Sequence, residues 1–300
     1  MTSVRPPTSA DPAPLRIGPT TFVWGQRTCV MGILNVTPDS FSGDGLLAAT
    51  DPVERALVTA RRMVDEGADL LDIGGESTRP GHAAIDEAEE IARVVPVVAA
   101  VAAALPPVAI SIDTTKPAVA EAALAAGAHL LNDVWATGPG GREIAAVAAA
   151  AGVPLIVMHN RAEARYDAPV ISEVVADLRE ALERAMAAGV PENNLIVDPG
   201  IGFGKTADHN IEVLRHLGSL SQLGRPILLG TSRKSTLGRI LDLPVEDRLE
   251  ATLATTALGI AAGVDIVRVH DVLANVRAAR VSDAIVRGHW RADMSGDGRA

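Results

Sequence analysis

"LIVDPGIGFGKT", residues 195–206, joins a short apolar run to a glycine-rich segment, as a strand leading into a phosphate-binding loop would. The spacing excludes a nucleotide-binding P-loop. The motif G-x-x-x-x-G-K-[ST], counted back from Gly204, needs a glycine where this chain has Pro199. The stretch therefore predicts a buried strand that ends in a carboxylate, Asp198, and the glycines must serve another purpose.

Seven further apolar runs of this kind occur along the chain. They lie at residues 30–34, 70–74, 108–112, 129–133, 154–158, 226–230 and 265–269. Helix-like segments separate them, at 53–66, 87–104, 116–126, 142–151, 172–188, 210–217, 248–262 and 272–286. Glycines that would end five of these helices stand at 67, 127, 152, 189 and 263.

The apolar runs show little polar–apolar alternation, which is typical of parallel strands covered by helices on both faces. Eight strand–helix units predict a single-domain α/β fold, the TIM (β/α)8 barrel. A doubly wound open sheet is the alternative, although it would usually contain fewer units and a glycine fingerprint after its first strand.

Composition and charge restrict the kinds of protein that this chain could be. Of the 300 residues 48% are hydrophobic but only 2% aromatic, so small aliphatic side chains must fill the core. We expect the barrel over residues 15–290, between flexible tails at 1–14 and 291–300. The net charge of −10 argues against a general nucleic-acid binder. No signal peptide or membrane-length apolar run is evident, which favours a soluble cytoplasmic protein. Cys29 is expected to be buried in a strand.

Polar residues gather at the carboxyl ends of the predicted strands, which is the end that carries the active site in a TIM barrel. Asp113, Asn132 and Asp198 would together suit the edge of a planar ligand rich in N–H groups, such as an aminopyrimidinone. A carboxylate beside a barrel core needs such donors opposite it. For Asp113 the alternative is N-capping of the next helix.

Cationic and amide side chains at the same rim indicate an anion site. They are Asn35, Arg79, Arg268 and His270, and loops after strands seven and eight often hold phosphate in barrels. A structural salt bridge is the alternative for Arg268 and for its neighbour at this rim, Arg233.

Seven segments, taken in order, resemble bacterial dihydropteroate synthases from about residue 16 to 290. They read "MGILNVTPDSFS", "DIGGESTRPG", "SIDTTK", "LLND", "DPGIGFGK", "GTSRKS" followed by "LG", and "RVHDV". The resemblance implies a TIM barrel, usually a homodimer. It also implies an Mg²⁺-assisted reaction that joins 6-hydroxymethyl-7,8-dihydropterin pyrophosphate to p-aminobenzoate and releases pyrophosphate.

The resemblance also implies roles for single residues. Pterin-binding residues would be Asp113, Asn132, Met158, Asp198, Phe203 and Lys234. Pyrophosphate-binding residues would be Asn35, Arg79, Arg268 and His270, with Asn35 also binding Mg²⁺. Residues around p-aminobenzoate would be Phe41, Thr78, Arg79, Pro80 and Ser235. Asn35, Lys234, Arg268 and His270 would take part in catalysis, in which pyrophosphate leaves before the aniline nitrogen attacks.

Two segments depart from the family pattern, "SFSGDGL" in the first loop and "MHNRAEARYDAP" after the fifth strand. They leave Asp44 and His159 without an assigned role. Two rival functions stay open at this point: a pterin-dependent methyltransferase of the same superfamily, and a catalytically silent pterin-binding homologue. Whether the chain is a sulfonamide target or a sulfonamide-resistant variant is not decided by the sequence.

Overall fold

The computed structural model describes residues 12–36, 51–76 and 85–288. Predicted site residues Phe41, Thr78, Arg79 and Pro80 therefore lie outside the described residues, as does Asp44. Both predicted tails fall largely outside them as well.

Within the described ranges the chain forms ten strands and nine α-helices. The strands are β1 (Leu15–Ile17), β2 (Thr20–Phe22), β3 (Cys29–Asn35), β4 (Leu70–Gly74), β5 (Ala109–Asp113), β6 (Leu130–Asp133), β7 (Leu155–Met158), β8 (Leu195–Asp198), β9 (Leu228–Leu229) and β10 (Ile266–Val269). The helices are α1 (Pro52–Asp65), α2 (Glu87–Ala104), α3 (Pro117–Ala125), α4 (Gly141–Ala151), α5 (Val170–Ala187), α6 (Ala207–Arg215), α7 (Ser235–Leu241), α8 (Leu249–Ala261) and α9 (Val272–Val286). Three short 3-10 helices are η2 (Glu192–Asn194), η3 (Leu217–Leu223) and η4 (Val245–Asp247).

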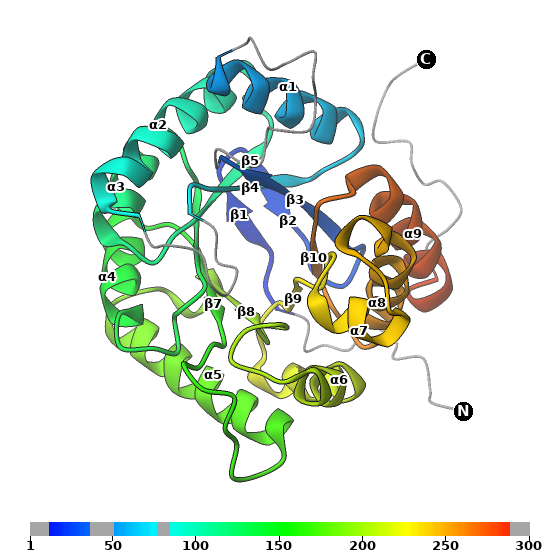
Figure 1. Cartoon of the computed structure of the whole chain (residues 1–300). Coiled ribbons are helices and arrows are strands. Elements are labelled where there is room, and N and C mark those ends of the chain that lie inside the picture. Colours follow the sequence, from blue (N-terminus) through cyan, green and yellow to red (C-terminus); the bar gives the residue numbers. More distant parts are fainter. Residues whose placement is uncertain (1–11, 37–50, 77–84, 289–300) are drawn as a thin grey trace.

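Eight parallel strands form one sheet in the order β8-β7-β6-β5-β4-β3-β10-β9. A parallel bridge between Val197 and Ile227 and a 2.9 Å hydrogen bond from Val197 N to Pro226 O join the two outer strands. The sheet is therefore closed, with the helices in a ring around it (Figure 1). This confirms the predicted single-domain TIM barrel and excludes the open sheet.

Each strand alternates between two apolar environments, which is why it reads as uniformly hydrophobic. Met31, Leu70 and Leu130 belong to the cluster inside the barrel. Leu34 and Leu71 belong to the larger cluster between the strands and the helices. Successive side chains of a strand point to opposite faces, so residues two apart share an environment. Residues two or four positions after a member of the inner cluster therefore also face the barrel interior, which identifies the inward-facing residues at the carboxyl rim.

A short hairpin, β1–β2, fills the amino end of the barrel, and the sequence did not predict it. Its three-residue strands are too short to produce a pattern. Leu15, Ile17, Phe22 and Trp24 pack into the same inner cluster as the first residues of the barrel strands. The hairpin therefore closes the end of the barrel opposite to the polar rim.

The helix boundaries largely follow prediction. All five predicted helix-ending glycines have positive φ, between 67° and 113°. Helix α6 starts at Ala207 rather than 210, because the Thr206 side chain accepts a hydrogen bond from His209 N and forms a capping box. Helix α7 was not predicted, since it has seven residues. None of the helices found in residues 12–36, 51–76 and 85–288 combines the length and the hydrophobicity that a membrane span requires.

Candidate active site

Strand register brings the predicted polar residues into one row. Across β3 to β6, Asn35 pairs with Gly74, Gly74 with Asp113, and Asp113 with Asn132. Residues paired across parallel strands point to the same side, and this parity is that of the inward-facing cluster. The predicted side chains of β3, β5 and β6 therefore share one rim and face the barrel interior, and Gly74, which has no side chain, lies between Asn35 and Asp113.

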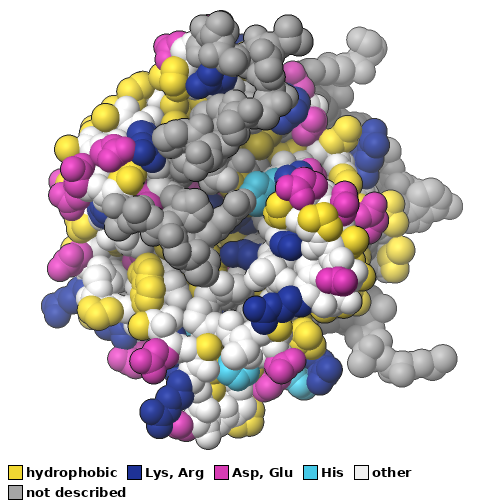
Figure 2. Space-filling view, viewed as in Figure 1, with side chains coloured by type: hydrophobic (Ala, Val, Ile, Leu, Met, Phe, Trp, Pro, Cys, Tyr) yellow, Lys and Arg dark blue, Asp and Glu magenta, His cyan; other side chains and the backbone are white. Residues whose placement is uncertain are grey.

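The same parity places Met158 and Asp198, which pair across β7 and β8, on the other side of this rim. Met158 and Asp198 are both buried, at 3% and 5% exposure. Figure 2 shows Lys and Arg side chains at the centre of this face, beside α7. The rim thus combines buried acids with cations at its mouth.

Arg268 connects two of the buried acids. Its Nε donates to Asp72 Oδ2 at 2.6 Å and its Nη2 to Asp113 Oδ2 at 2.6 Å. Asn132 Nδ2 donates to the same Asp72 oxygen at 3.0 Å. Asp72 is fully buried and was not among the predicted site residues. The network fixes the orientation of both Asp113 and Asn132 before any ligand binds.

This geometry bears on the alternatives given above for Asp113, capping of the next helix, and for Arg268, a structural salt bridge. Asp113 does not cap the following helix, because the N-cap of α3 is Lys116 and no side chain caps that end. Arg268 does form the salt bridges that were its alternative, yet it forms them inside the rim. It therefore lies between the predicted pterin residues and the predicted anion site.

Two acids of the rim have raised pKa values. Burial raises the pKa of Asp198 to about 6, against a hydrogen bond from Gly200 N to its Oδ1 (2.7 Å) and the charge of Lys234. Burial also raises the pKa of Asp113 to about 7, although the Arg268 guanidinium opposes the shift. Among the described residues, Asp113 Oδ1 has no hydrogen-bond partner. A buried oxygen without a donor indicates a place for a ligand N–H group.

The glycine-rich loop after β8 fits closely against its neighbours. A Cβ at Gly200 would lie 1.8 Å from His159 O, and one at Gly204 would lie 2.4 Å from Arg161 O. Both glycines also have positive φ. The loop directs the Phe203 ring to a position 3.9 Å from Lys234 Nζ. The glycines therefore permit close backbone packing beside an aromatic ring and an ammonium group. This is the purpose that they serve in place of binding a nucleotide phosphate.

Side chains of the loop after β9 support the end of β10. Ser232 Oγ lies 3.0 Å from His270 Nδ1 and accepts a hydrogen bond from His270 N at 3.1 Å. Ser232 thus orients His270, a role that the sequence did not predict. Arg233 instead forms a two-point ion pair with Asp271, at 3.0 and 2.5 Å. For Arg233 the salt-bridge alternative is confirmed.

Two residues that the sequence analysis singled out, Ser235 and Cys29, remain to be placed. Ser235 is exposed and is the first residue of α7. Cys29 is buried at the start of β3, and burial raises its pKa to about 12, as expected of an inert thiol.

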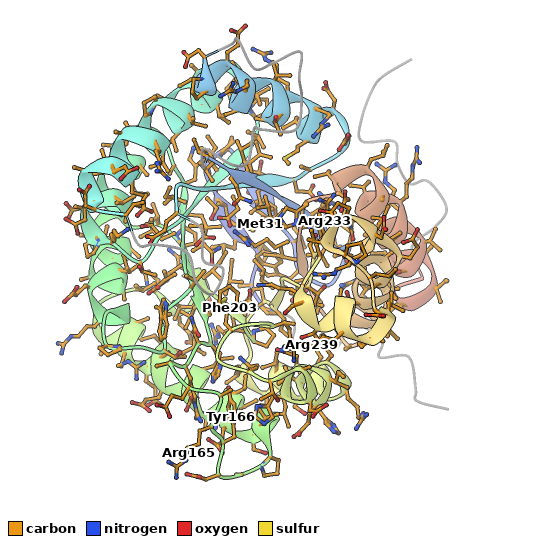
Figure 3. All side chains as sticks on the ribbon, in the orientation of Figure 1. Met31, Arg165, Tyr166, Phe203, Arg233 and Arg239 are labelled. Atoms are coloured by element: carbon orange, nitrogen blue, oxygen red, sulfur yellow. The ribbon has the colours of Figure 1, made fainter. Side chains whose placement is uncertain are left out.

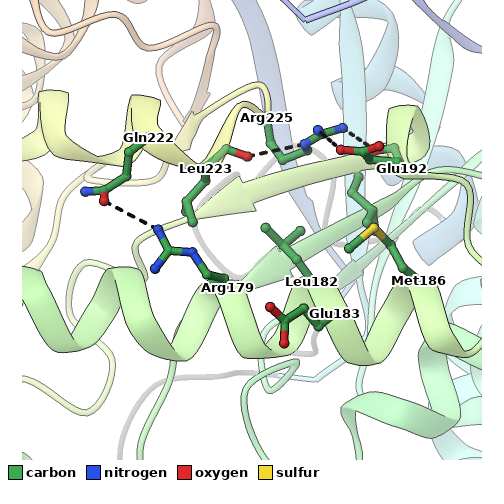
Figure 4. A pocket seen from close by; sticks show the side chains of 9 residues that line it. Arg179, Leu182, Glu183, Met186, Glu192, Gln222, Leu223 and Arg225 are labelled. Atoms are coloured by element: carbon green, nitrogen blue, oxygen red, sulfur yellow. Dashed lines mark hydrogen bonds and ion pairs between the residues drawn. The ribbon is translucent and has the colours of Figure 1, made fainter.

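A shallow cavity lies at the opposite end of the barrel, between α5 and the segments before β8 and β9 (Figure 4). Two of its cations are paired: Arg225 with Glu192, and Arg179 with Gln222 at 3.4 Å. None of the predicted site residues lines it. The candidate active site is therefore the polar rim and not this cavity.

Known proteins resemble this chain over most of its length. A family model described as "Pterin binding enzyme" matches residues 31–270. A Clostridium beijerinckii protein named dihydropteroate synthase is 48% identical over 91% of this chain and 100% of its own length. The structure of a Clostridium difficile dihydropteroate synthase with pteroic acid has 48% identity and a TM-score of 0.84, covering 89% of this chain and 99% of that one. The Xanthomonas albilineans enzyme in complex with 7,8-dihydropteroate has 40% identity and a TM-score of 0.82, covering 91% and 98%.

Proposed function

This chain belongs to the pterin-binding enzymes, on their dihydropteroate synthase branch, and we propose how its own residues perform that reaction. The enzyme is a transferase. It condenses 6-hydroxymethyl-7,8-dihydropterin pyrophosphate with p-aminobenzoate, giving 7,8-dihydropteroate and pyrophosphate. Neither rival function gains support, because the similar proteins reported above are synthases.

The observation that carries the residue assignment is the buried Oδ1 of Asp113, which has no hydrogen-bond partner among the residues that the structure describes. Asp113 lies beside Asn132 on the neighbouring strand, and Asp198 lies three strands away around the same rim. The aminopyrimidinone edge of a pterin offers N–H donors and a carbonyl in one plane. We assign the N–H groups to the two carboxylates and the remaining edge to the Asn132 amide. Hydrogen bonds from the ring then replace the solvation that the acids lose by burial.

Phe203, Met158 and Lys234 complete the pterin slot in this proposal. The flat ring would lie beside Phe203, with Met158 as apolar floor and the Lys234 ammonium toward the carbonyl side. Lys234 already lies over the Phe203 ring. This placement keeps the ring plane fixed while the side-chain methylene faces the mouth of the barrel.

Asn35, Arg268 and His270 would receive the pyrophosphate, with Arg79 from outside the described residues. Departure of pyrophosphate leaves a cationic methylene on the pterin, stabilised by the ring electrons and by the charges of Asp113 and Asp198. The aniline nitrogen of p-aminobenzoate then attacks that carbon and loses a proton. Cations placed where the negative charge develops lower the barrier to this step. No covalent bond to the enzyme is needed.

We propose Mg²⁺ as the cofactor, held by Asn35 and by the substrate. A Cβ on Gly74 would lie 3.9 Å from Asn35 Oδ1 and 3.8 Å from Asp113 Oδ2, so both side-chain oxygens lie beside Gly74 at the carboxyl rim. In the described ranges, no three acidic, His or Cys side chains form a metal cluster. Mg²⁺ commonly binds through one or two protein oxygens plus substrate phosphates, and the residues fit that mode. When bound, it would neutralise charge on the leaving pyrophosphate.

The p-aminobenzoate side would be formed by Ser235 on α7, together with Phe41, Thr78, Arg79 and Pro80. Ser235 is exposed at the mouth of the barrel, next to Lys234. The arylamine would therefore enter after the pterin, from the open side. Because both substrates are small and water-soluble, we also propose a cytoplasmic location.

We further propose that two copies associate through α8 and α9. Leu258 on α8 and Val281 and Ile285 on α9 are 71%, 62% and 73% exposed. The two helices pack against each other, and Figure 2 shows hydrophobic side chains on this side of the molecule. A cluster of exposed large apolar side chains marks an association surface. Light scattering should give the mass of two chains, and Ile285→Asp should shift it toward one chain. A monomeric parent at high concentration contradicts this assembly.

The catalytic proposal is tested by measuring both products. The protein is given the dihydropterin pyrophosphate, Mg²⁺ and p-aminobenzoate, and dihydropteroate and pyrophosphate are quantified. The proposal predicts equal amounts of the two, formed only when p-aminobenzoate is present. Pterin binding without turnover would instead identify a silent homologue.

A further inference from the structure

A buried cluster behind the glycine-rich loop is not used in the chemistry above. His159, at the end of β7, has no solvent exposure. Its Nε2 lies 3.0 Å from Asp177 Oδ2 on α5, and its Nδ1 lies 2.8 Å from Lys205 Nζ. Lys205 is the lysine of "GFGK", and 46 residues separate it from His159. The cluster therefore links three separate parts of the barrel.

Donors and acceptors in the cluster match one to one. Lys205 Nζ contacts His159 Nδ1, Gly200 O at 3.0 Å and Phe203 O at 3.1 Å. A lysine ammonium has three N–H donors, and these three acceptors use all of them. Lys205 consequently has no donor left for a substrate. It acts on the loop backbone at both ends of the stretch that carries Phe203.

Asp177 determines which ring nitrogen of His159 carries the proton. Burial lowers the pKa of His159 to about 4, against the hydrogen bond with Asp177, so the ring is neutral at physiological pH. A neutral imidazole carries one N–H, and the Asp177 carboxylate holds it on Nε2. Nδ1 is then an acceptor, as the contact with Lys205 requires. Arg161 Nε in turn donates to Asp177 Oδ2 at 2.8 Å and holds the carboxylate in place.

The segment that departs from the family pattern, "MHNRAEARYDAP" at residues 158–169, supports the loop from outside. Tyr166 Oη donates to Gly204 O at 2.8 Å, and the Arg161 guanidinium lies 4.5 Å from the Tyr166 ring. In Figure 3, Phe203 lies at the mouth of the barrel and Tyr166 farther out, on the segment that precedes α5. The loop is thus fixed on its inner side by Lys205 and on its outer side by Tyr166.

We propose that Lys205, oriented by His159 and Asp177, is a positioning residue for the pterin slot. It holds the carbonyls of Gly200 and Phe203, so the Phe203 ring stays beneath Lys234, and it sets pterin affinity without touching the substrate. This inference rests on the proposed pterin binding. The segment at residues 158–169 then has a structural role as well, because its Tyr166 holds the same glycine-rich loop.

The test compares Lys205→Met with the control Arg225→Met. Arg225 is also a cation that holds backbone carbonyls, Glu192 O at 2.7 Å and Leu223 O at 3.4 Å, but at the opposite end of the barrel. Binding of 6-hydroxymethyl-7,8-dihydropterin is measured by calorimetry at pH 6.5. That pH lies below the value of about 7 to which burial lowers the pKa of Lys205. Thermal midpoints and the KM for p-aminobenzoate are measured alongside.

Lys205→Met should raise the pterin Kd about tenfold or more, the equivalent of one lost charged hydrogen bond, with the KM for p-aminobenzoate within about twofold of the parent. Arg225→Met should lower the thermal midpoint while leaving the pterin Kd within about twofold. An unchanged Kd in Lys205→Met overturns the inference. So does an equal loss of affinity in the control.

Tyr166→Phe keeps the assay decisive if Lys205→Met does not fold. It retains the ring and removes one hydrogen bond to the loop, so the pterin Kd should rise about threefold to tenfold. A Kd equal to that of the parent overturns the inference. If the parent itself does not bind the pterin, the proposed function fails instead, so the two failures are distinguishable.

Discussion

Asp198→Asn isolates one contact of the proposed pterin slot, and its effect should depend on pH. Asp198 Oδ1 already accepts a hydrogen bond from Gly200 N, so one oxygen is left for the ligand. A hydrogen bond to a charged group contributes about 1.5–3 kcal/mol. The substitution keeps the shape and removes the charge, so at pH 8 it should weaken pterin binding about 10- to 150-fold.

The pH dependence follows from the raised pKa of Asp198, which burial brings to about 6. Ring N–H groups bind the carboxylate form. The parent therefore binds fully well above pH 6 and loses affinity as pH falls through that value. At pH 5 roughly one tenth of the groups are ionised, so the advantage of the parent over Asp198→Asn should shrink about tenfold between pH 8 and pH 5.

Calorimetric titration with 6-hydroxymethyl-7,8-dihydropterin at pH 5, 6, 7 and 8 measures this ratio. The ligand lacks a pyrophosphate that would itself titrate. Titration of Asp113 occurs in both proteins and largely cancels from the ratio. The reasoning is refuted if Asp198→Asn binds like the parent at pH 8, or if the ratio is the same at pH 5 and pH 8.

Three further outcomes are expected. Asp72→Asn weakens a buried ion pair with Arg268 and should destabilise the fold by about 3 kcal/mol, lowering the thermal midpoint by about 6 °C; an unchanged midpoint would mean that the pair is dispensable. Arg268→Ala should reduce turnover and weaken inhibition by pyrophosphate about tenfold or more, and unaltered product inhibition would remove Arg268 from the anion site. Chelation of Mg²⁺ should stop turnover but spare binding of 6-hydroxymethyl-7,8-dihydropterin, whereas full activity in a chelator would contradict the proposed role of Asn35.

The barrel could be predicted because its repeating units are local. Each apolar run and each helix-ending glycine lies within a short window, and the carboxyl-end rule then ordered the polar residues on one rim. The rule identified Asp113, Asn132 and Asp198 because each stands at the last or nearly last residue of its strand. The spacing of the glycines alone distinguished the "DPGIGFGK" loop from a P-loop.

Asp72 was missed although the sequence held a signal for it. It lies two residues before Gly74, so it shares the inward face of β4, and a charged residue inside an apolar strand must find a partner. The partner, Arg268, is 196 residues away, which no local pattern reveals. The same limit applies to Lys205, whose acceptor His159 is known only once β7 and β8 are adjacent.

A crystal structure of the protein with bound 6-hydroxymethyl-7,8-dihydropterin tests the central claim most directly. The account predicts the ring inside the carboxyl rim, beside Phe203, with its N–H groups on the carboxylates of Asp113 and Asp198 and its edge on Asn132. A ring bound outside this rim, or bound there without contacts to the two carboxylates, would contradict it.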